Sequence, residues 1–393
     1  MTTVRDRVVA LTSELVKRSR IDGYDEGGQE LLAEHLSRLG FTIDRVPLRH
    51  CNNLLALRGD GPGYFAFSGH TDVVVAGDGW SVNPFQGTVV GERLLGRGVA
   101  DMKGSVAAWI VALEDFVSAH PNTRLPLALL IAGDEEVQSE GTPALLERLV
   151  SQGKKIESCL VGEPTANKYL GDCIKIGRRG SLSARVSVRG VQGHVAYPHL
   201  ARNAIHAAVR IINKLIAFDI DAGLPKNTAS ESDLGWPPSS LQVSSLHAGT
   251  GAGTNIVPGQ AEFRFNIRFR TPLTRETLIE RLTPLLEDSH VSVEVAWTQG
   301  SQPYDSKNGN LREIVASTLR EHGHLPVYTR DGGTSDGRFV AEHGAEVVEV
   351  GPSNATIHKI DEGLEIAELV ELVQIYGVIL NKLAERASTC SLS

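Results

Sequence analysis

The chain has 393 residues, of which 41% are hydrophobic and 22% are charged, and its formal net charge is −8 at pH 7. A chain of this length usually forms two domains, and this composition is typical of an ordinary globular protein. The negative charge argues against nucleic acid or an anionic membrane as a partner. The apolar stretches are too short to span a membrane.

The four cysteines have no paired spacing, which predicts free thiols in a reducing compartment rather than a disulfide framework. Residues 1–7 lack the apolar core of a signal peptide and resemble the start of a helix. We therefore expect a cytoplasmic protein. The cysteines are Cys51, Cys159, Cys173 and Cys390.

In chain order, helical periodicity covers residues 4–18 and 26–39, and Gly40 suits the position at which the second helix stops. Apolar strands then alternate with helices as far as residue 162. This alternation predicts an α/β fold in which helices cover both faces of a parallel-rich sheet. The expected strands are 41–46, 53–58, 64–68, 126–132 and 158–162, and the expected helices follow Gly104 and cover 142–152.

The pattern changes at about residue 182, where the strict alternation of residues 182–190 indicates a half-solvated antiparallel strand. The elements that follow have the β-α-β-β-α-β order of a ferredoxin-like domain. We therefore expect a catalytic domain of residues 1–181 and 298–393, interrupted by a smaller α+β domain of residues 182–297. The other expected elements are strands 241–246, 261–269 and 291–297, helices 203–217, 274–287 and 364–385, and a loop at 219–238.

Several apolar runs are followed closely by a histidine or a carboxylate. Because strand ends line the ligand crevice of an open α/β sheet, we expect these side chains to converge. Two histidines and several carboxylates, with no cysteine among them, suit a hydrolytic zinc site better than a closed structural one. The residues are His70, Asp72, Asp101, Glu135, Glu136, Glu163 and His358.

Each of these residues alone also has a structural explanation. Asp101 precedes a helix, where an aspartate commonly caps the N-terminus, although a shared carboxylate could also bridge two cations. Glu135 and Glu136 suit a solvated loop. If both carboxylates are buried, their repulsion raises the pKa of one of them unless a cation binds the other. One glutamate would then be a metal ligand and the other a general base. Asp72 can accept the second ring N–H of His70.

Polar residues outside this set are candidates for binding substrate. His194 follows a glycine between two elements of the insert, which favours a functional position. The basic segments 175–179 and 268–270 form either a solvated face or a site for a substrate carboxylate. The loop 332–338 offers N–H groups and hydroxyls to an anion, and Asn255 lies in another polar loop.

Four stretches, residues 177–181, 190–199, 333–339 and 354–359, carry a resemblance to a known family. With the residues above, they resemble the di-zinc aminoacylase and exopeptidase family, and within it most of all the members that remove succinyl groups in bacterial lysine synthesis. The resemblance implies two Zn²⁺ ions per subunit, with Co²⁺ as a substitute, and Asp101 as their shared ligand. It implies that His70 and Glu163 bind one zinc ion and that Glu136 and His358 bind the other. It also implies that Glu135 is the general base and that Asp72 orients His70.

The resemblance also implies a homodimer, in which the insert is both lid and interface and His194 reaches the partner subunit's active site. The expected activity is hydrolysis of an N-succinyl amino acid. N-acetylornithine deacetylase activity, a related aminoacylase or carboxypeptidase, and a catalytically silent binding protein are the alternatives. Thr254 and Arg330–Asp331 depart from the family pattern and leave the acyl and amino-acid preference open. The implied substrate contacts are Arg178, Tyr197, Asn255, Arg268 and Thr334.

Overall fold

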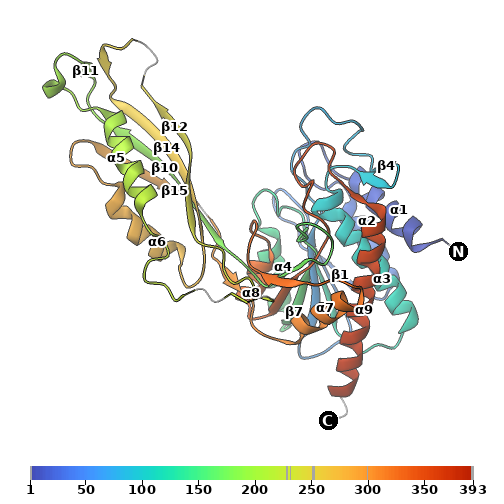
Figure 1. The fold of residues 1–393 in the computed structure, drawn as a ribbon. Helices are drawn as coiled ribbons and strands as arrows, with labels where there is room; N and C mark the ends of the chain where they lie inside the picture. The colour runs from blue at the N-terminus through green and yellow to red at the C-terminus, as the bar shows by residue number, and fades with distance from the viewer. Residues whose placement is uncertain (1, 227–228, 231, 250–252, 299, 391–393) are drawn as a thin grey trace.

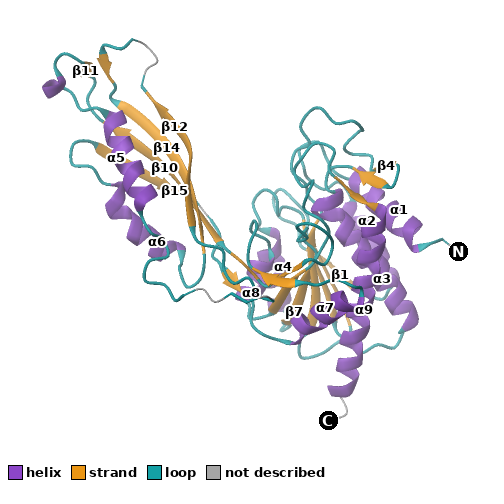
Figure 2. Cartoon of the chain, in the orientation of Figure 1, coloured by secondary structure: helices purple, strands orange, loops and turns teal. Residues whose placement is uncertain are grey.

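The computed structural model describes residues 2–226, 229–230, 232–249, 253–298 and 300–390. It has two parts, each built around its own sheet, joined by a few chain segments (Figures 1 and 2). Within the described ranges, no helix combines the length and the apolar character needed to cross a membrane.

The larger part contains an eight-stranded sheet in the order β1-β2-β6-β3-β7-β18-β8-β17. Its four central strands, β6, β3, β7 and β18, run parallel, whereas β1 and β2 are antiparallel additions at one edge. The predicted parallel-rich sheet is confirmed. The strands are β1 (Thr42–Arg45), β2 (Leu54–Arg58), β3 (Tyr64–His70), β6 (Leu127–Ala132), β7 (Ile156–Val161), β8 (Cys173–Lys175), β17 (Val327–Thr329) and β18 (Glu346–Glu349).

Helices cover both faces of this sheet because alternate strand residues point to opposite sides. One face packs against α1 (Val4–Lys17), α2 (Gly28–Arg38), α3 (Gly104–Ala119), α7 (Asn310–Glu321) and α9 (Ile366–Cys390). The other face packs against α4 (Gly141–Ser151) and α8 (Gly337–Glu342). Helix α3 is buried almost all round, and its Trp109 ring stacks on Phe67 of β3 with ring centroids 4.7 Å apart.

The smaller part is an antiparallel sheet in the order β12-β14-β10-β15, and its core includes residues of α5 and α6. The predicted β-α-β-β-α-β order is confirmed by β10 (Gly180–Arg189), α5 (Ala204–Ala217), β12 (Ser240–Ala248), β14 (Gln260–Phe269), α6 (Arg275–Leu282) and β15 (Ser292–Trp297). Helix α6 is shorter than predicted: a 3₁₀ turn at Thr283–Leu286 follows it, because Pro284 has no N–H to continue the α-helical ladder.

Some elements escaped the sequence patterns because they are short. They include the three-stranded sheet of β4 (Thr88–Val90), β5 (Arg93–Leu95) and β19 (Gly363–Glu365), and the pair β11 (Gly193–His194) and β13 (Ile256–Val257). The predicted loop at 219–238 contains no helix or strand in its described part, and residues 227–228 and 231 lie outside it. Cys51, Cys159 and Cys173 carry free thiols, as predicted.

Candidate metal centre

The predicted ligands meet at the C-terminal edge of the parallel strands. His70 is the last residue of β3, and Glu163 follows the end of the adjacent strand β7. Glu135 and Glu136 follow β6, which pairs with β3 on its other side. Asp101 lies in the turn Val99–Lys103 that leads into α3. The sheet order therefore explains why segments far apart in sequence converge.

Asp101 presents one carboxylate oxygen to each of two histidines. Its Oδ1 lies 3.3 Å from Nε2 of His70, and its Oδ2 lies 3.3 Å from Nε2 of His358. A second carboxylate accompanies each histidine: Glu163 Oε1 is 3.9 Å from the His70 ring nitrogen, and Glu136 Oε1 is 3.0 Å from that of His358. The arrangement is two histidine–carboxylate pairs on either side of one shared carboxylate.

These separations fit two metal ions. Two ligand atoms about 2.1 Å from a tetrahedral zinc ion lie about 3.4 Å from each other, which is close to the separations between Asp101 and its two histidines. Imidazole and carboxylate are both ordinary zinc ligands. Glu136 also comes within 4.8 Å of His70 and Asp101, and Glu135 comes within the same range of His70 and Glu163. Geometry alone therefore leaves both glutamates within reach of a cation.

The charges of the cluster also indicate that it binds cations. Burial and the neighbouring Asp101 raise the pKa of Glu163 well above its usual value, and burial and Glu163 do the same to the pKa of Glu135. Hydrogen bonds to Asp101 and Glu136 raise the pKa of His358 to about 10. Carboxylates packed this closely repel one another, and positive charge between them relieves that repulsion. The donor set therefore fits a cationic cofactor.

Asp72 connects His70 to the loop that carries the two glutamates. Its carboxylate oxygens accept hydrogen bonds from the backbone N–H groups of Glu135 (3.1 Å) and Glu136 (2.9 Å). Its Oδ1 lies 3.5 Å from Nδ1 of His70, and its main-chain carbonyl is nearer, at 3.0 Å. Asp72 thus lies against the ring predicted to bind metal and also fixes the adjacent acidic loop.

Comparison with known proteins agrees with this geometry. Residues 66–382 match the model of peptidase family M20/M25/M40. The chain belongs to this family. It is 42% identical over 380 residues to a succinyl-diaminopimelate desuccinylase of Psychromonas ingrahamii, and 43% identical over 380 residues to that of Pseudoalteromonas atlantica. Each alignment covers 96% of this chain and 98% of the relative.

Solved M20 structures share the fold at much lower identity. An M20 family metallo-carboxypeptidase from Sulfolobus solfataricus superposes with a TM-score of 0.80 at 18% identity, covering 96% of this chain and 99% of its own. A tripeptidase from Staphylococcus aureus gives 0.77 at 19% identity, covering 97% of this chain and 99% of its own. The two-part architecture is therefore that of the M20 fold, and the enzyme is a metal-dependent hydrolase of this family.

Arg178, a predicted substrate contact, already has partners within its own chain. Its guanidinium group forms a buried ion pair with Glu349, with Nε 2.9 Å from Oε2, and it also donates to the carbonyls of Asp331 and Gly333. The atypical Arg330 is similarly paired, with Asp233 at 2.7 Å and Asp305 at 2.9 Å. Arg330 therefore adds no unpaired charge to the loop 332–338.

Arg268 is in a different situation. It lies on β14 opposite Ser181 of β10, and burial together with the nearby Arg179 lowers its pKa. Among the described residues, neither Arg179 nor Arg268 has a carboxylate within ion-pairing distance, and Arg179 donates to the carbonyl of Pro238. Two half-buried guanidinium groups without an acidic partner suit an anionic ligand.

His194, Tyr197 and Asn255 lie together at the far end of the insert. His194 is in β11, which Figure 1 shows at the tip of the insert, well away from the large sheet. The rings of His194 and Tyr197 are 5.8 Å apart between centroids, and the carbonyl of Asn255 accepts from the N–H of Val195. The tip therefore lies far from the metal cluster of its own chain.

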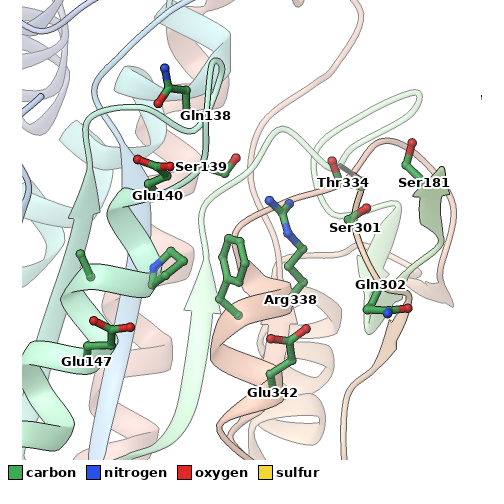
Figure 3. Close-up of a pocket in the computed structure, with 14 residues that line it drawn as sticks. Gln138, Ser139, Glu140, Glu147, Ser181, Ser301, Gln302, Thr334, Arg338 and Glu342 are labelled. Atoms are coloured by element: carbon green, nitrogen blue, oxygen red, sulfur yellow. The ribbon is translucent and has the colours of Figure 1, made fainter. Parts of the chain in front are cut away.

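Thr334 lines a polar cleft of about 570 Å³ beside the acidic loop (Figure 3). One wall begins at Gln138, two residues after Glu136, and the opposite wall carries Ser181 and Arg338. None of the five predicted metal ligands lines this cleft. Its walls mix hydroxyls, carboxylates and one guanidinium group, which suits a ligand that carries both signs of charge.

Sequence patterns missed Glu362, which lies in the loop after His358. Its Oε1 accepts from the backbone N–H groups of Gly98 (3.1 Å), Ala100 (3.0 Å) and Asp101 (3.1 Å), while Oε2 pairs with buried Arg97. Gly98 adopts φ of 86°, a left-handed conformation that glycine accepts readily. Glu362 thus holds the Asp101 turn in place. Only its spacing of four residues from His358 could have indicated it.

We expect Glu362→Gln to weaken metal binding about 10- to 100-fold, the range seen when supports of metal ligands are removed. The glutamine amide cannot form the ion pair with Arg97, so the turn that carries Asp101 should be held less firmly. Competition with a chromophoric chelator measures the affinity. Glu365→Gln, an exposed residue of β19 that pairs with Arg93, is the matched control. Unchanged metal affinity with a lowered melting temperature would show that Glu362 supports only the fold.

Proposed function

We propose that this M20 enzyme removes the succinyl group from N-succinyl-L,L-2,6-diaminopimelate in bacterial lysine and diaminopimelate biosynthesis. The observation that carries the hydrolytic part is the shared carboxylate of Asp101 between two histidine–carboxylate pairs. Support for the substrate comes from the two relatives of that name, to which the chain is 42–43% identical over nearly its whole length.

In this proposal Asp101 would contribute to both of two zinc sites, His70 and Glu163 would complete one site, and Glu136 and His358 would complete the other. Zinc held there would supply Lewis-acid chemistry, which activates water and polarises the amide carbonyl. Glu135 takes the proton of the attacking water and returns it to the leaving amine. Its carboxylate lies within 4.8 Å of the ligand atoms of His70 and Glu163, and this position supports the role.

We further propose that residues 1–181 and 298–393 form the catalytic domain, and that residues 182–297 form a lid through which two subunits associate. The remoteness of His194, Tyr197 and Asn255 from the metal cluster supports a role in the partner's site. The insert tip also exposes Val191, Val195, Tyr197 and Leu200. The three free thiols are consistent with a cytoplasmic enzyme.

The acyl group is recognised, in this proposal, by the Arg179–Arg268 pair rather than by Arg178, whose guanidinium group is paired with Glu349. A succinyl group ends in a carboxylate that can pair with these arginines, whereas an acetyl group leaves them without a partner. Buried polar groups left unpaired by the wrong substrate give large discrimination.

The test compares N-succinyl-diaminopimelate with its N-acetyl analogue in the zinc-loaded enzyme. We expect kcat/KM to favour the succinyl substrate by about 10³-fold or more. Arg268→Met should lower that value for the succinyl substrate and leave the value for the acetyl analogue nearly unchanged. Arg270→Met, which removes a guanidinium group paired with Asp221, is the control. Comparable values for both substrates in the unaltered enzyme would favour a deacetylase such as an N-acetylornithine deacetylase.

A further inference from the structure

A second group of metal-ligating side chains lies outside the paired site. His50, Cys51 and Asp134 each offer one ligand atom, and these atoms all lie within 4.8 Å of one another. Nε2 of His50 is 3.0 Å from Oδ2 of Asp134. The ligand types are imidazole, thiol and carboxylate, whereas the proposed hydrolytic site contains only nitrogen and oxygen ligands.

The sheet places these residues together. Strand β2 pairs antiparallel with β6, so the segment before β2, which carries His50 and Cys51, meets the segment after β6, which carries Asp134. Gly133 permits the close approach, because a Cβ there would lie 2.3 Å from the carbonyl of Asn52 and 3.4 Å from Cβ of Cys51. The juxtaposition is therefore built into the fold.

Asp134 is fully buried, and it already organises the acidic loop. Its carboxylate accepts from the N–H groups of Glu140 (2.9 Å) and Gly141 (2.8 Å), and its carbonyl accepts from Val137, Gln138 and Ser139. Each carboxylate oxygen has two lone pairs, so these bonds leave room for a cation. A cation here would connect the segment before β2 to the loop that contains Glu135 and Glu136.

We propose that His50, Cys51 and Asp134 form a third cation site, selective for a soft divalent ion such as Zn²⁺, Co²⁺ or Cd²⁺. Thiolate and imidazole favour such ions over Mg²⁺ or Ca²⁺, and three protein ligands leave a fourth position for water. Burial and the charge of Asp134 raise the pKa of Cys51 to about 12, so the thiol keeps its proton until a metal displaces it.

The test uses cobalt, because thiolate–Co²⁺ charge transfer absorbs in the near ultraviolet and nitrogen–oxygen sites lack this band. When the metal-free full chain is titrated with Co²⁺, two equivalents should fill the paired site and a third should bind at the His50–Cys51–Asp134 site. Binding of the third equivalent to the wild type should produce the charge-transfer band and increase the melting temperature. Cys51→Ser should bind one equivalent less, lose the band, and keep the hydrolytic activity of the enzyme loaded with two equivalents. Cys173→Ser is the matched control and should keep the band.

His50→Gln provides an independent variant if the Cys51 substitution fails to fold, and it should likewise lose the third equivalent. A wild type that binds only two equivalents without a thiolate band would overturn the proposal. So would a band that survives in Cys51→Ser. In either case His50 and Asp134 form a hydrogen-bonded structural pair, which holds the loop without metal.

Discussion

Glu135→Gln is expected to retain both zinc ions and to lose about 10²- to 10⁴-fold in kcat, the range attributed to a general base. The amide has nearly the shape of the carboxylate but cannot take a proton from water. Its backbone N–H still reaches Asp72, so the acidic loop keeps its position. Metal content by elemental analysis and steady-state kinetics measure the two effects separately.

Glu136→Ala is the matched comparison on the same loop. It removes the carboxylate 3.0 Å from the ring of His358, so we expect it to lose metal as well as activity. A carboxylate oxygen of each glutamate lies within 4.8 Å of a ring nitrogen of His70, so either glutamate could bind the same metal ion, and the comparison decides between them. Equal loss of zinc in the two variants would show that Glu135 is itself a ligand, and the base would then have to be another group.

Mixed dimers of His194→Ala and Glu135→Gln should recover about half of wild-type activity, although each variant alone should be nearly inactive. In the proposed dimer, the His194→Ala subunit would keep Glu135 and borrow His194 from its partner, so one of the two sites would be complete. The second site lacks both groups. The physical reason is the position of His194 at the tip of the insert, far from the ligands of its own chain (Figure 1).

The measurement requires heterodimers purified with two different affinity tags after co-expression. A mixture of the two separate homodimers, combined without subunit exchange, is the control and should stay inactive. If verified heterodimers are as inactive as their parents, His194 acts within its own subunit and the insert must close onto the site instead.

Local patterns in the sequence were enough to predict most of the longer helices and strands and the candidate ligands. His70, Glu135 and Glu163 each come shortly after an apolar run, and such runs are strands whose ends share one edge of the sheet. The alternation after residue 182 likewise predicted the insert, because a period of two describes a half-buried strand.

Most individual contacts between distant segments, other than the convergence of the candidate ligands, could not be predicted. Glu349 lies within the buried strand β18, and only the folded chain shows that it neutralises Arg178. Glu362 supports Asp101 across 261 residues of sequence, and His50 meets Asp134 across 84. Such pairs carry no periodic signal, since they depend on how strands and loops are ordered in space.

The two parts are joined at a narrow connection, the neck, where Ser181 and Ser301 meet. A small rotation there moves the outer end of the insert by a larger distance. Ser181 and Ser301 exchange backbone hydrogen bonds of 2.9 and 3.0 Å there, and Gly300 allows the contact because a Cβ would lie 1.9 Å from the carbonyl of Ser181. Beyond Ser181, strand β10 continues outward for eight more residues to Arg189, about 26 Å at 3.3 Å per residue. A rotation of about 5° at the neck therefore moves the outer end of β10 by about 2 Å, enough to make or break a hydrogen bond. Substitutions at Gly300 should therefore change turnover by altering the angle of the insert, although Gly300 contacts no reacting group.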